Sequence, residues 1–112
     1  MGRYLIVLYF YSQKNAEDPD LVRNLQALRL AANILGKDLS FIRYLDPNAA
    51  ADYILGNLDK FGRILFVSEI DLSTEITTKL AGAGAKVTFV PNIVMQFAWI
   101  RDLASDFVDG KL

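Results

Sequence analysis

The stretch Tyr4–Phe10, YLIVLYF, is a continuous apolar run near the N-terminus and is rich in β-branched and aromatic side chains. The run is too short for a core helix, and it lacks the polar and apolar alternation of a strand with one solvated face. It is typical of a strand buried on both faces, as the strands of parallel sheets are. After a polar segment, Asp18-Pro19 supplies an N-cap carboxylate and a proline at the first position of a helix.

The same strand and helix signals recur along the chain. Further strands are predicted at Leu39–Leu45, Arg63–Val67 and Lys86–Val90. Helices are predicted over 19–35, over 48–60, from a cap at Asp71 or Ser73 to Gly82, and over 93–107. Gly36 is placed to end the first helix, and Asp46-Pro47 repeats at the second helix the start signal of the first. Pro91 ends the fourth strand, and Asn92 can cap the last helix.

Four strand–helix units with short connections predict a parallel sheet that carries helices on both faces, joined by right-handed crossovers. We therefore predict an α/β fold. Its architecture is a three-layer sandwich with a four- to five-stranded, mainly parallel sheet of flavodoxin or Rossmann type. The chain has 112 residues, too few for two cores of ordinary size, so residues 1–112 are expected to form a single domain.

Charge and hydropathy restrict the surroundings of the protein. The 12 basic and 13 acidic residues are interspersed and give a net charge of −1, so nucleic acid is not expected as a partner. No window approaches the length of a membrane span, and no signal-peptide cleavage pattern follows Met1, so no membrane association is expected. The absence of cysteine excludes a disulfide scaffold, and the expected location is cytoplasmic.

The chemistry open to this chain is limited, because it contains neither cysteine nor histidine. Thiol, imidazole and zinc-thiolate chemistry are therefore excluded for the chain itself. The loop after the first predicted strand contains no glycine, so it does not form a glycine-rich phosphate loop. No catalytic residue, metal or cofactor is expected, and the sequence favours a non-enzymatic role.

A candidate ligand-binding cleft follows from the predicted topology. In an open α/β sheet, ligands bind beyond the carboxyl ends of the strands, near the point where the strand order reverses. Glu69 and Asp71 could act there as paired acids or hold magnesium, although solvated carboxylates that cap a helix are the commoner reason for such a pair. The polar residues of these loops form the candidate cleft: Ser12, Gln13, Ser68, Glu69, Asp71 and Asn92.

The last predicted helix is apolar around most of its circumference. One stripe consists of Ile93, Phe97, Ile100, Ala104 and Phe107. A second face is also apolar, and we predict that it forms an oligomer interface, because a helix that is apolar all round is buried all round. Alternatively, Trp99 or Met95 packs beneath a loop or the C-terminal tail. The residues of the predicted interface are Val94, Met95, Ala98 and Trp99.

Two stretches of the chain together resemble the DsrE/DsrF-like family of small sulfur-relay proteins. The first consists of Leu5–Leu8, Asp18–Asp20 and Leu25–Ala32, and the second consists of Ile64–Ser68, Gly84–Thr88 and Arg101–Val108. The resemblance covers nearly the whole chain, although each piece is a common α/β pattern. It implies a flavodoxin-like sheet with a short fifth strand near Phe107–Val108. It also implies a homo-oligomer, as a trimer or hexamer, or a hetero-oligomer with a related subunit.

The sequence departs from that family at the position of its sulfur chemistry. Active members carry a persulfide on a cysteine near the end of the third strand, where this chain has Val67, Ser68 and Glu69. Serine cannot form a persulfide. The resemblance therefore implies a non-catalytic member, acting as a structural subunit or binding a partner or small ligand in sulfur transfer.

Two other functions stay open at the level of the sequence. One is a small Rossmann-like enzyme that binds or hydrolyses a ligand with Glu69 and Asp71. The other is a degenerate resolvase-type recombinase domain, because Tyr9–Ser12 resembles the start of such domains. The catalytic arginines of that family are missing, and the net charge of −1 argues against DNA as a partner.

Overall fold

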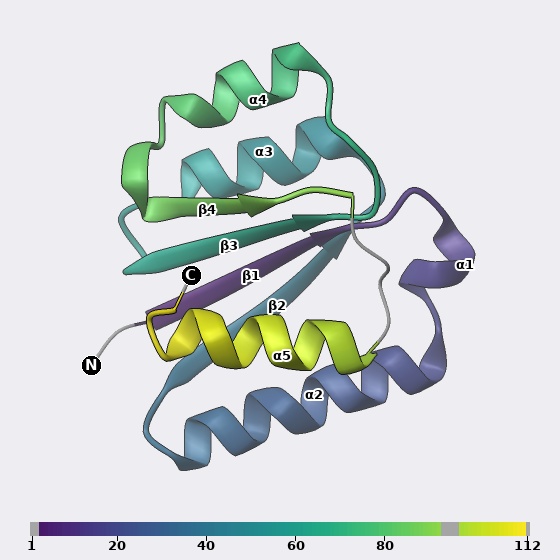
Figure 1. The fold of residues 1–112 in the computed structure, drawn as a ribbon, viewed down its shortest axis with the longest axis vertical. Coiled ribbons are helices and arrows are strands. Elements are labelled where there is room, and N and C mark those ends of the chain that lie inside the picture. The colour runs from purple at the N-terminus through teal and green to yellow at the C-terminus, as the bar shows by residue number, and fades with distance from the viewer. Residues whose placement is uncertain (1–2, 93–96, 112) are drawn as a thin grey trace.

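The computed structural model describes residues 3–92 and 97–111. The described chain contains a four-stranded sheet in the order β2-β1-β3-β4, and all neighbouring strands are parallel (Figure 1). The strands are β1 (Arg3–Tyr9), β2 (Asp38–Tyr44), β3 (Arg63–Ser68) and β4 (Val87–Val90). The helices are α1 (Gln13–Ala16), α2 (Pro19–Ile34), α3 (Pro47–Gly56), α4 (Thr74–Ala81) and α5 (Phe97–Val108), with a 3-10 turn at Gly84–Lys86.

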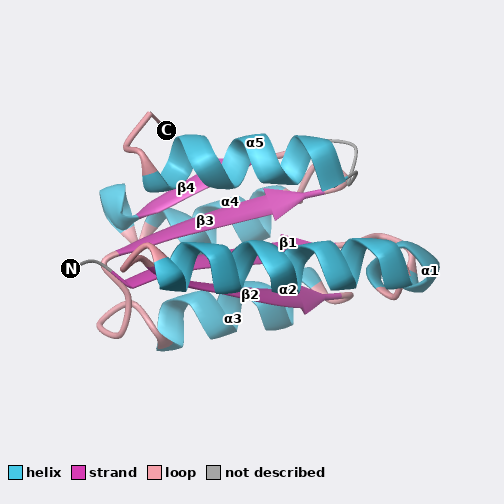
Figure 2. Ribbon diagram, turned by 90° about the horizontal axis from the view of Figure 1, so that it is seen from below, coloured by secondary structure: helices cyan, strands magenta, loops and turns pink. Residues whose placement is uncertain are grey.

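The helices cover the sheet from both sides. Helices α2 and α5 lie on one face, and α3 and α4 lie on the other (Figures 1 and 2). Successive residues of β1 point to opposite faces, so Ile6 and Leu8 join one core while Leu5 and Val7 join the other. This arrangement confirms the predicted three-layer α/β sandwich with a parallel sheet.

The helix signals of the sequence have the expected structural roles. The Asp18 carboxylate accepts the backbone N–H groups of Asp20 at 2.9 Å and Leu21 at 3.3 Å, and Asp46 accepts that of Asn48 at 3.0 Å. Gly36 has a φ of 82°, a left-handed conformation that costs a glycine little. Capping thus begins α2 and α3 where the aspartate–proline pairs predict.

The expected fifth strand near Phe107–Val108 is wrong. Both residues belong to α5, whose last turns are held by core packing. The Phe107 ring is fully buried, and the Arg63 guanidinium lies 4.5 Å from the ring centroid and donates to the Phe107 carbonyl at 2.7 Å. A buried aromatic ring at this position stabilises the helix against an extended end.

Two further differences concern element boundaries. The polar segment after β1 contains the short helix α1, which the sequence does not predict because only Ala16 of its residues is buried. Helix α3 ends at Gly56, four residues before the predicted end at Lys60. Both differences lie at chain reversals, where few apolar contacts mark the secondary structure.

Candidate functional site

The carboxyl edge of the sheet has its topological switch point between β1 and β3. The chain leaves β1 toward α2 and β2 on one side, and it leaves β3 toward α4 and β4 on the other. Ligands of open α/β sheets bind in the crevice at such a point. Ser68 ends β3 directly beside Tyr9 at the end of β1, so this crevice is the place to test the predicted cleft.

Ser68 is fully buried, and its hydroxyl is used within its own loop. The hydroxyl donates to the Ile70 carbonyl oxygen and accepts the Ile70 N–H at 3.3 Å. Such a side chain stabilises a turn by replacing a backbone partner. Ser68 therefore terminates the strand as a structural residue and is not presented to a ligand.

Glu69 joins the two loops of the switch point. Its carboxylate accepts the Tyr11 backbone N–H at 3.0 Å and the Asn15 side-chain amide at 2.8 Å. Its own N–H donates to the Tyr9 carbonyl at 3.0 Å. In phosphate-binding α/β proteins, backbone N–H groups of the first loop receive the anion of the ligand. Here the protein's own carboxylate takes that role, so the crevice is closed by an internal anion.

The remaining residues of the predicted cleft do not converge on a common group. Ser12 precedes α1 without a side-chain cap bond, and the Gln13 amide donates to Glu17 at 3.1 Å. Asp71 is exposed and makes no hydrogen bond or ion pair with another described residue. Asn92 is exposed with a φ of 60°, a left-handed turn conformation that asparagine tolerates. Over 3–92 and 97–111, no three acidic residues gather as a metal site.

Two tyrosines near this edge of the sheet have raised pKa values. Burial raises the pKa of Tyr9 above that of an ordinary tyrosine, and the charges of Asp46, Tyr11 and Glu69 raise it further. Burial likewise raises the pKa of Tyr44, with a smaller contribution from Tyr53. Both phenols are therefore neutral at physiological pH, where they pack against neighbouring side chains and do not act as bases.

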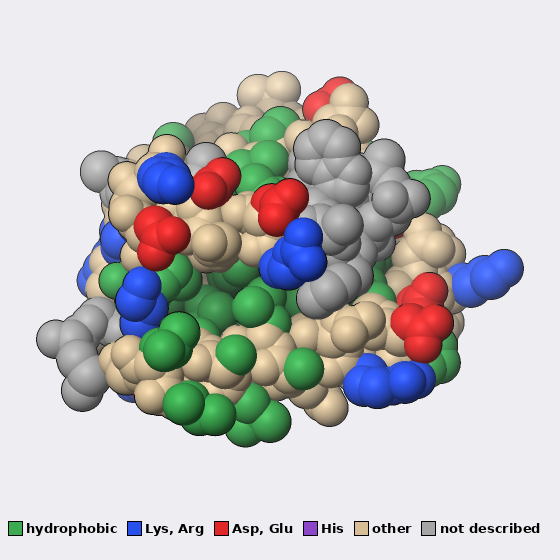
Figure 3. All heavy atoms as spheres, turned by 60° about the horizontal axis from the view of Figure 1, so that its bottom comes forward, with side chains coloured by type: hydrophobic (Ala, Val, Ile, Leu, Met, Phe, Trp, Pro, Cys, Tyr) green, Lys and Arg blue, Asp and Glu red, His purple; other side chains and the backbone are tan. Residues whose placement is uncertain are grey.

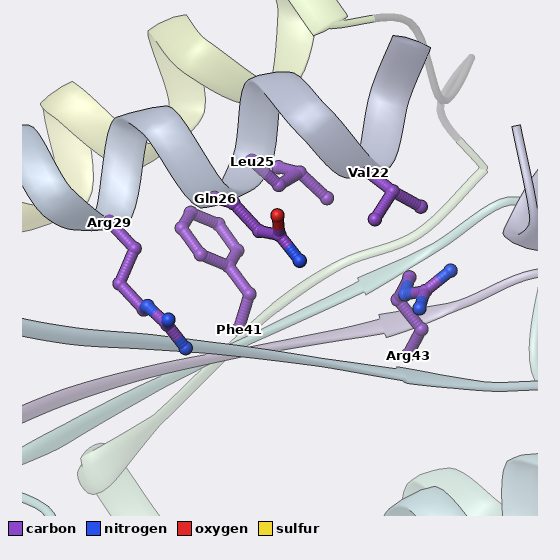
Figure 4. Close-up of a pocket in the computed structure, with 6 residues that line it drawn as sticks. All are labelled: Val22, Leu25, Gln26, Arg29, Phe41 and Arg43. Atoms are coloured by element: carbon purple, nitrogen blue, oxygen red, sulfur yellow. The ribbon is translucent and has the colours of Figure 1, made fainter. Parts of the chain in front are cut away.

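A second region lies beside β2, on the side of β1 away from β3. Its polar side chains are not bonded to a carboxylate of the described residues. A cavity of about 110 Å³ lies between α2 and the edge strand β2 (Figure 4). This cavity has no signal in the sequence, because one arginine on a helix and another on a strand are each typical of ordinary solvated residues. Its lining residues are Val22, Leu25, Gln26, Arg29, Phe41 and Arg43.

The predicted interface residues fall largely outside the described structure. Val94 and Met95 lie outside the described residues, and Ala98 and Trp99 belong to α5 without a description of their side chains. The oligomer prediction for this face stays a prediction. On the same side of the sheet, α2 has large aliphatic side chains in solvent, which the sequence did not single out.

Comparison with known proteins leaves the family of this chain open. No protein-family model matches the sequence, and no curated protein matches it significantly. In the described part of the chain, none of the helices has the length and apolar composition needed to cross a bilayer. We therefore infer the function from the residues themselves.

Proposed function

We propose that this chain is a non-catalytic, self-associating α/β subunit that binds a partner, in the manner implied by its resemblance to the DsrE/DsrF-like family. In a sulfur-transfer setting it would support the relay without carrying sulfur. The observation that carries the proposal is the exposed aliphatic surface of α2. Three large residues within six positions are mostly in solvent: Leu30 at 57%, Ile34 at 83% and Leu35 at 77% exposure.

This surface adjoins an apolar groove between α2 and α5. Figure 3 shows hydrophobic side chains gathered over α2 and in the hollow between the two helices. The groove has a volume of about 180 Å³ and is lined by Leu28, Ala31, Ala32, Leu35, Lys37, Leu39, Ala104, Ser105, Val108 and Asp109. Contiguous apolar surface of this kind marks interaction sites in proteins of this size. A second copy that covered the groove and its rim would remove these side chains from water.

The state of the switch point supports the absence of catalysis. The Ser68 hydroxyl bonds within its own loop, and the Glu69 carboxylate is held by Tyr11 and Asn15. A nucleophile needs a neighbouring base, and a general acid needs access to substrate. These observations favour a subunit over the alternative of a hydrolytic enzyme that uses Glu69 and Asp71.

Analytical ultracentrifugation of the whole chain tests the proposal. The wild-type protein is expected to sediment as a trimer or hexamer, and Ile34→Glu/Leu35→Glu is expected to shift it to the 12.5 kDa monomer. Two buried carboxylates in an apolar interface carry a desolvation cost that association cannot offset. Thr78→Glu, an exposed position on α4 and therefore on the other face of the sheet, is the control and should leave the mass unchanged.

Trp99→Glu separates the two candidate faces. If the first half of α5 also lies in the interface, as its sequence predicts, this variant dissociates the oligomer as well. An oligomer that survives Trp99→Glu but not the α2 variant restricts the interface to the α2 groove. A wild-type monomer at high micromolar concentration would rule out self-association altogether.

A further inference from the structure

We propose that the free edge of β2 and the flank of α2 above it form a binding site for an acidic peptide segment, which pairs with β2 as an additional strand. The site uses Phe41 and Arg43 of β2 and Arg29 of α2, none of which lines the apolar groove proposed above for self-association. The proposal therefore goes beyond the proposed function, and each can fail without the other.

The backbone of β2 presents hydrogen-bonding groups to solvent over its second half. In a parallel ladder, the N–H and C=O of alternate residues point to the same neighbour. The Tyr44 carbonyl accepts the Phe10 N–H at 2.9 Å, so the backbone N–H and C=O groups of Tyr44 and Ile42 point toward β1. Those of Phe41 and Arg43 point away from β1, toward the open edge. Within residues 3–92 and 97–111, strand β2 is the last in the sheet on this side. The outward groups of Phe41 and Arg43 are thus available to another strand.

The first half of the same edge is already closed. Leu39 also points its N–H outward, but the Asn33 side chain accepts it at 3.2 Å. Asn33 follows Val22, Gln26 and Arg29 along one flank of α2, at successive spacings of four, three and four residues. The flank of α2 therefore blocks the edge at one end and lines it with polar side chains at the other. The open part has the length of a short peptide.

Two arginines supply the charge of the cavity beside the open edge. Figure 4 shows the guanidinium groups of Arg29 and Arg43 on either side of the Phe41 ring and the Gln26 amide. Arg43 donates to the Ala16 carbonyl, which anchors it and leaves its charge unpaired with any carboxylate in the described residues. The Arg29 side chain makes no hydrogen bond or ion pair with another described residue. The two charges are therefore free to meet acidic groups.

An extended peptide matches this arrangement in both backbone and charge. Its same-face side chains recur every two residues, about 6.8 Å apart, so two glutamates of one strand can reach toward α2 while the residue between them faces α3. Main-chain bonds to a sheet edge then provide affinity, and the side chains provide specificity. Two cavities extend this cleft past Arg43, toward Leu45 and toward Arg23, and leave room for a chain to continue. Glu17 lines both, so the acidic residues of the peptide are expected on the side of Arg29 and Arg43 away from it.

A second copy of this chain is a poor occupant of the same edge. Antiparallel pairing of β2 with its copy would bring two pairs of Arg29 and Arg43 into one cleft. Like charges at an edge strand are a device that proteins use to prevent such pairing. The charges that disfavour self-pairing at this edge favour an acidic partner.

Titration of the ¹⁵N-labelled chain with a blocked octapeptide of alternating glutamate and valine tests the inference. We expect saturable shifts of the Phe41 and Arg43 amide resonances, with affinity that falls as salt is raised. Arg29→Gln and Arg43→Gln should each weaken binding about two- to fivefold, the range of a solvent-exposed ion pair. Lys79→Gln, which removes an equal charge from the Lys79–Asp52 ion pair on the other face, should leave affinity unchanged.

Two probe peptides decide between strand pairing and simple attraction of charge. The same peptide N-methylated at alternate amides keeps its charge but cannot pair with the edge, and it should lose binding. The lysine-for-glutamate peptide should not bind. Equal binding of the N-methylated peptide, or full competition by inorganic phosphate, would overturn the proposal in favour of a small-anion cleft. An absence of shifts with the glutamate peptide would also overturn it, and the arginines would then serve only to protect the edge.

Discussion

Two places on the sheet, the switch point between β1 and β3 and the free edge of β2, differ in how their polar groups are used. At the switch point, the Ser68 hydroxyl is bonded within its own loop, and the Glu69 carboxylate is bonded to the loop that follows β1. At the β2 edge, Arg29 has no partner among the described residues, and Phe41 and Arg43 turn backbone groups to solvent. The fold thus closes the place where α/β proteins ordinarily bind ligands and leaves an unusual place open.

This difference shows that topology locates a crevice but does not make it a site. A site needs groups whose hydrogen-bonding and charge are not already satisfied within the protein, because a satisfied group gains little from a ligand. Glu69 illustrates the point, since the same carboxylate would be a candidate acid if Tyr11 and Asn15 did not hold it. The comparison can be tested from each side.

The largest expected effect concerns a thiol placed at the switch point. Active members of the DsrE/DsrF-like family, which this chain resembles, carry sulfur near the end of the third strand. Ser68→Cys puts a thiol at that position, which is fully buried. Its reaction with a thiol reagent should be on the order of a hundredfold slower than that of Ser12→Cys, which is partly exposed, because the loop must first open. Equal rates, measured by absorbance of the released chromophore, would mean that the end of β3 is accessible and that the crevice is not closed.

The second prediction compares one charged residue from each place. Glu69→Gln turns a side-chain NH₂ toward the donors of Tyr11 or Asn15 and should lower the free energy of unfolding by about 2 kcal/mol. Arg29→Gln should change it by less than about 0.5 kcal/mol, since no described residue depends on that guanidinium. Urea denaturation measures both. Similar losses for the two variants would contradict the distinction between a closed and an open region.

The third prediction concerns the end of the β2 edge at which Asn33 accepts the Leu39 N–H. Asn33→Ala removes the acceptor of the Leu39 N–H, so stability should fall by about 1 kcal/mol and the Leu39 amide should exchange faster with solvent. Asn24→Ala is the control, because Asn24 lies on the same helix without a side-chain bond to the described residues. Unchanged exchange at Leu39 would show that this end of the edge is closed by something other than Asn33.

The smallest effect is expected in the alkaline range. Because burial raises the pKa of Tyr9 in the folded protein, the unfolded chain releases its phenolic proton first, at the ordinary value near 10. Stability is therefore intact below about pH 10 and falls as the pH rises through the folded pKa. Tyr9→Phe should flatten this fall in thermal melts between pH 9 and 11, and exposed Tyr11→Phe should not. If the melting temperature of Tyr9→Phe falls with pH as steeply as that of the wild type, the Tyr9 phenol is exposed to water in the folded protein.

Much of the fold could be predicted from the sequence, because its signals are local. The apolar run Tyr4–Phe10 and the two aspartate–proline pairs each act within a few residues, and the structure confirms the strand and both helix starts. Leu35 shows where local signals are insufficient: it follows the apolar spacing of α2 but is 77% exposed at the rim of the groove between α2 and α5. Spacing along one helix does not say which neighbouring element covers its end. Phe107, assigned to a fifth strand by resemblance, belongs to α5 because its ring fits the core.

Some features of the candidate site can likewise be predicted from the sequence, and others depend on the three-dimensional structure. The α/β architecture and the serine in place of a cysteine at the end of β3 follow from the sequence, because apolar runs and capping residues locate the end of each strand. The bonds that occupy the Glu69 carboxylate and the cavity that Arg29 and Arg43 share follow from the tertiary structure. Both features involve residues far apart in the sequence: Tyr11 and Glu69, 58 positions apart, share a hydrogen bond, and Arg29 and Arg43, 14 positions apart, line one cavity. Hydrogen bonding and charge act through distance in space, which the fold sets and a linear pattern does not contain.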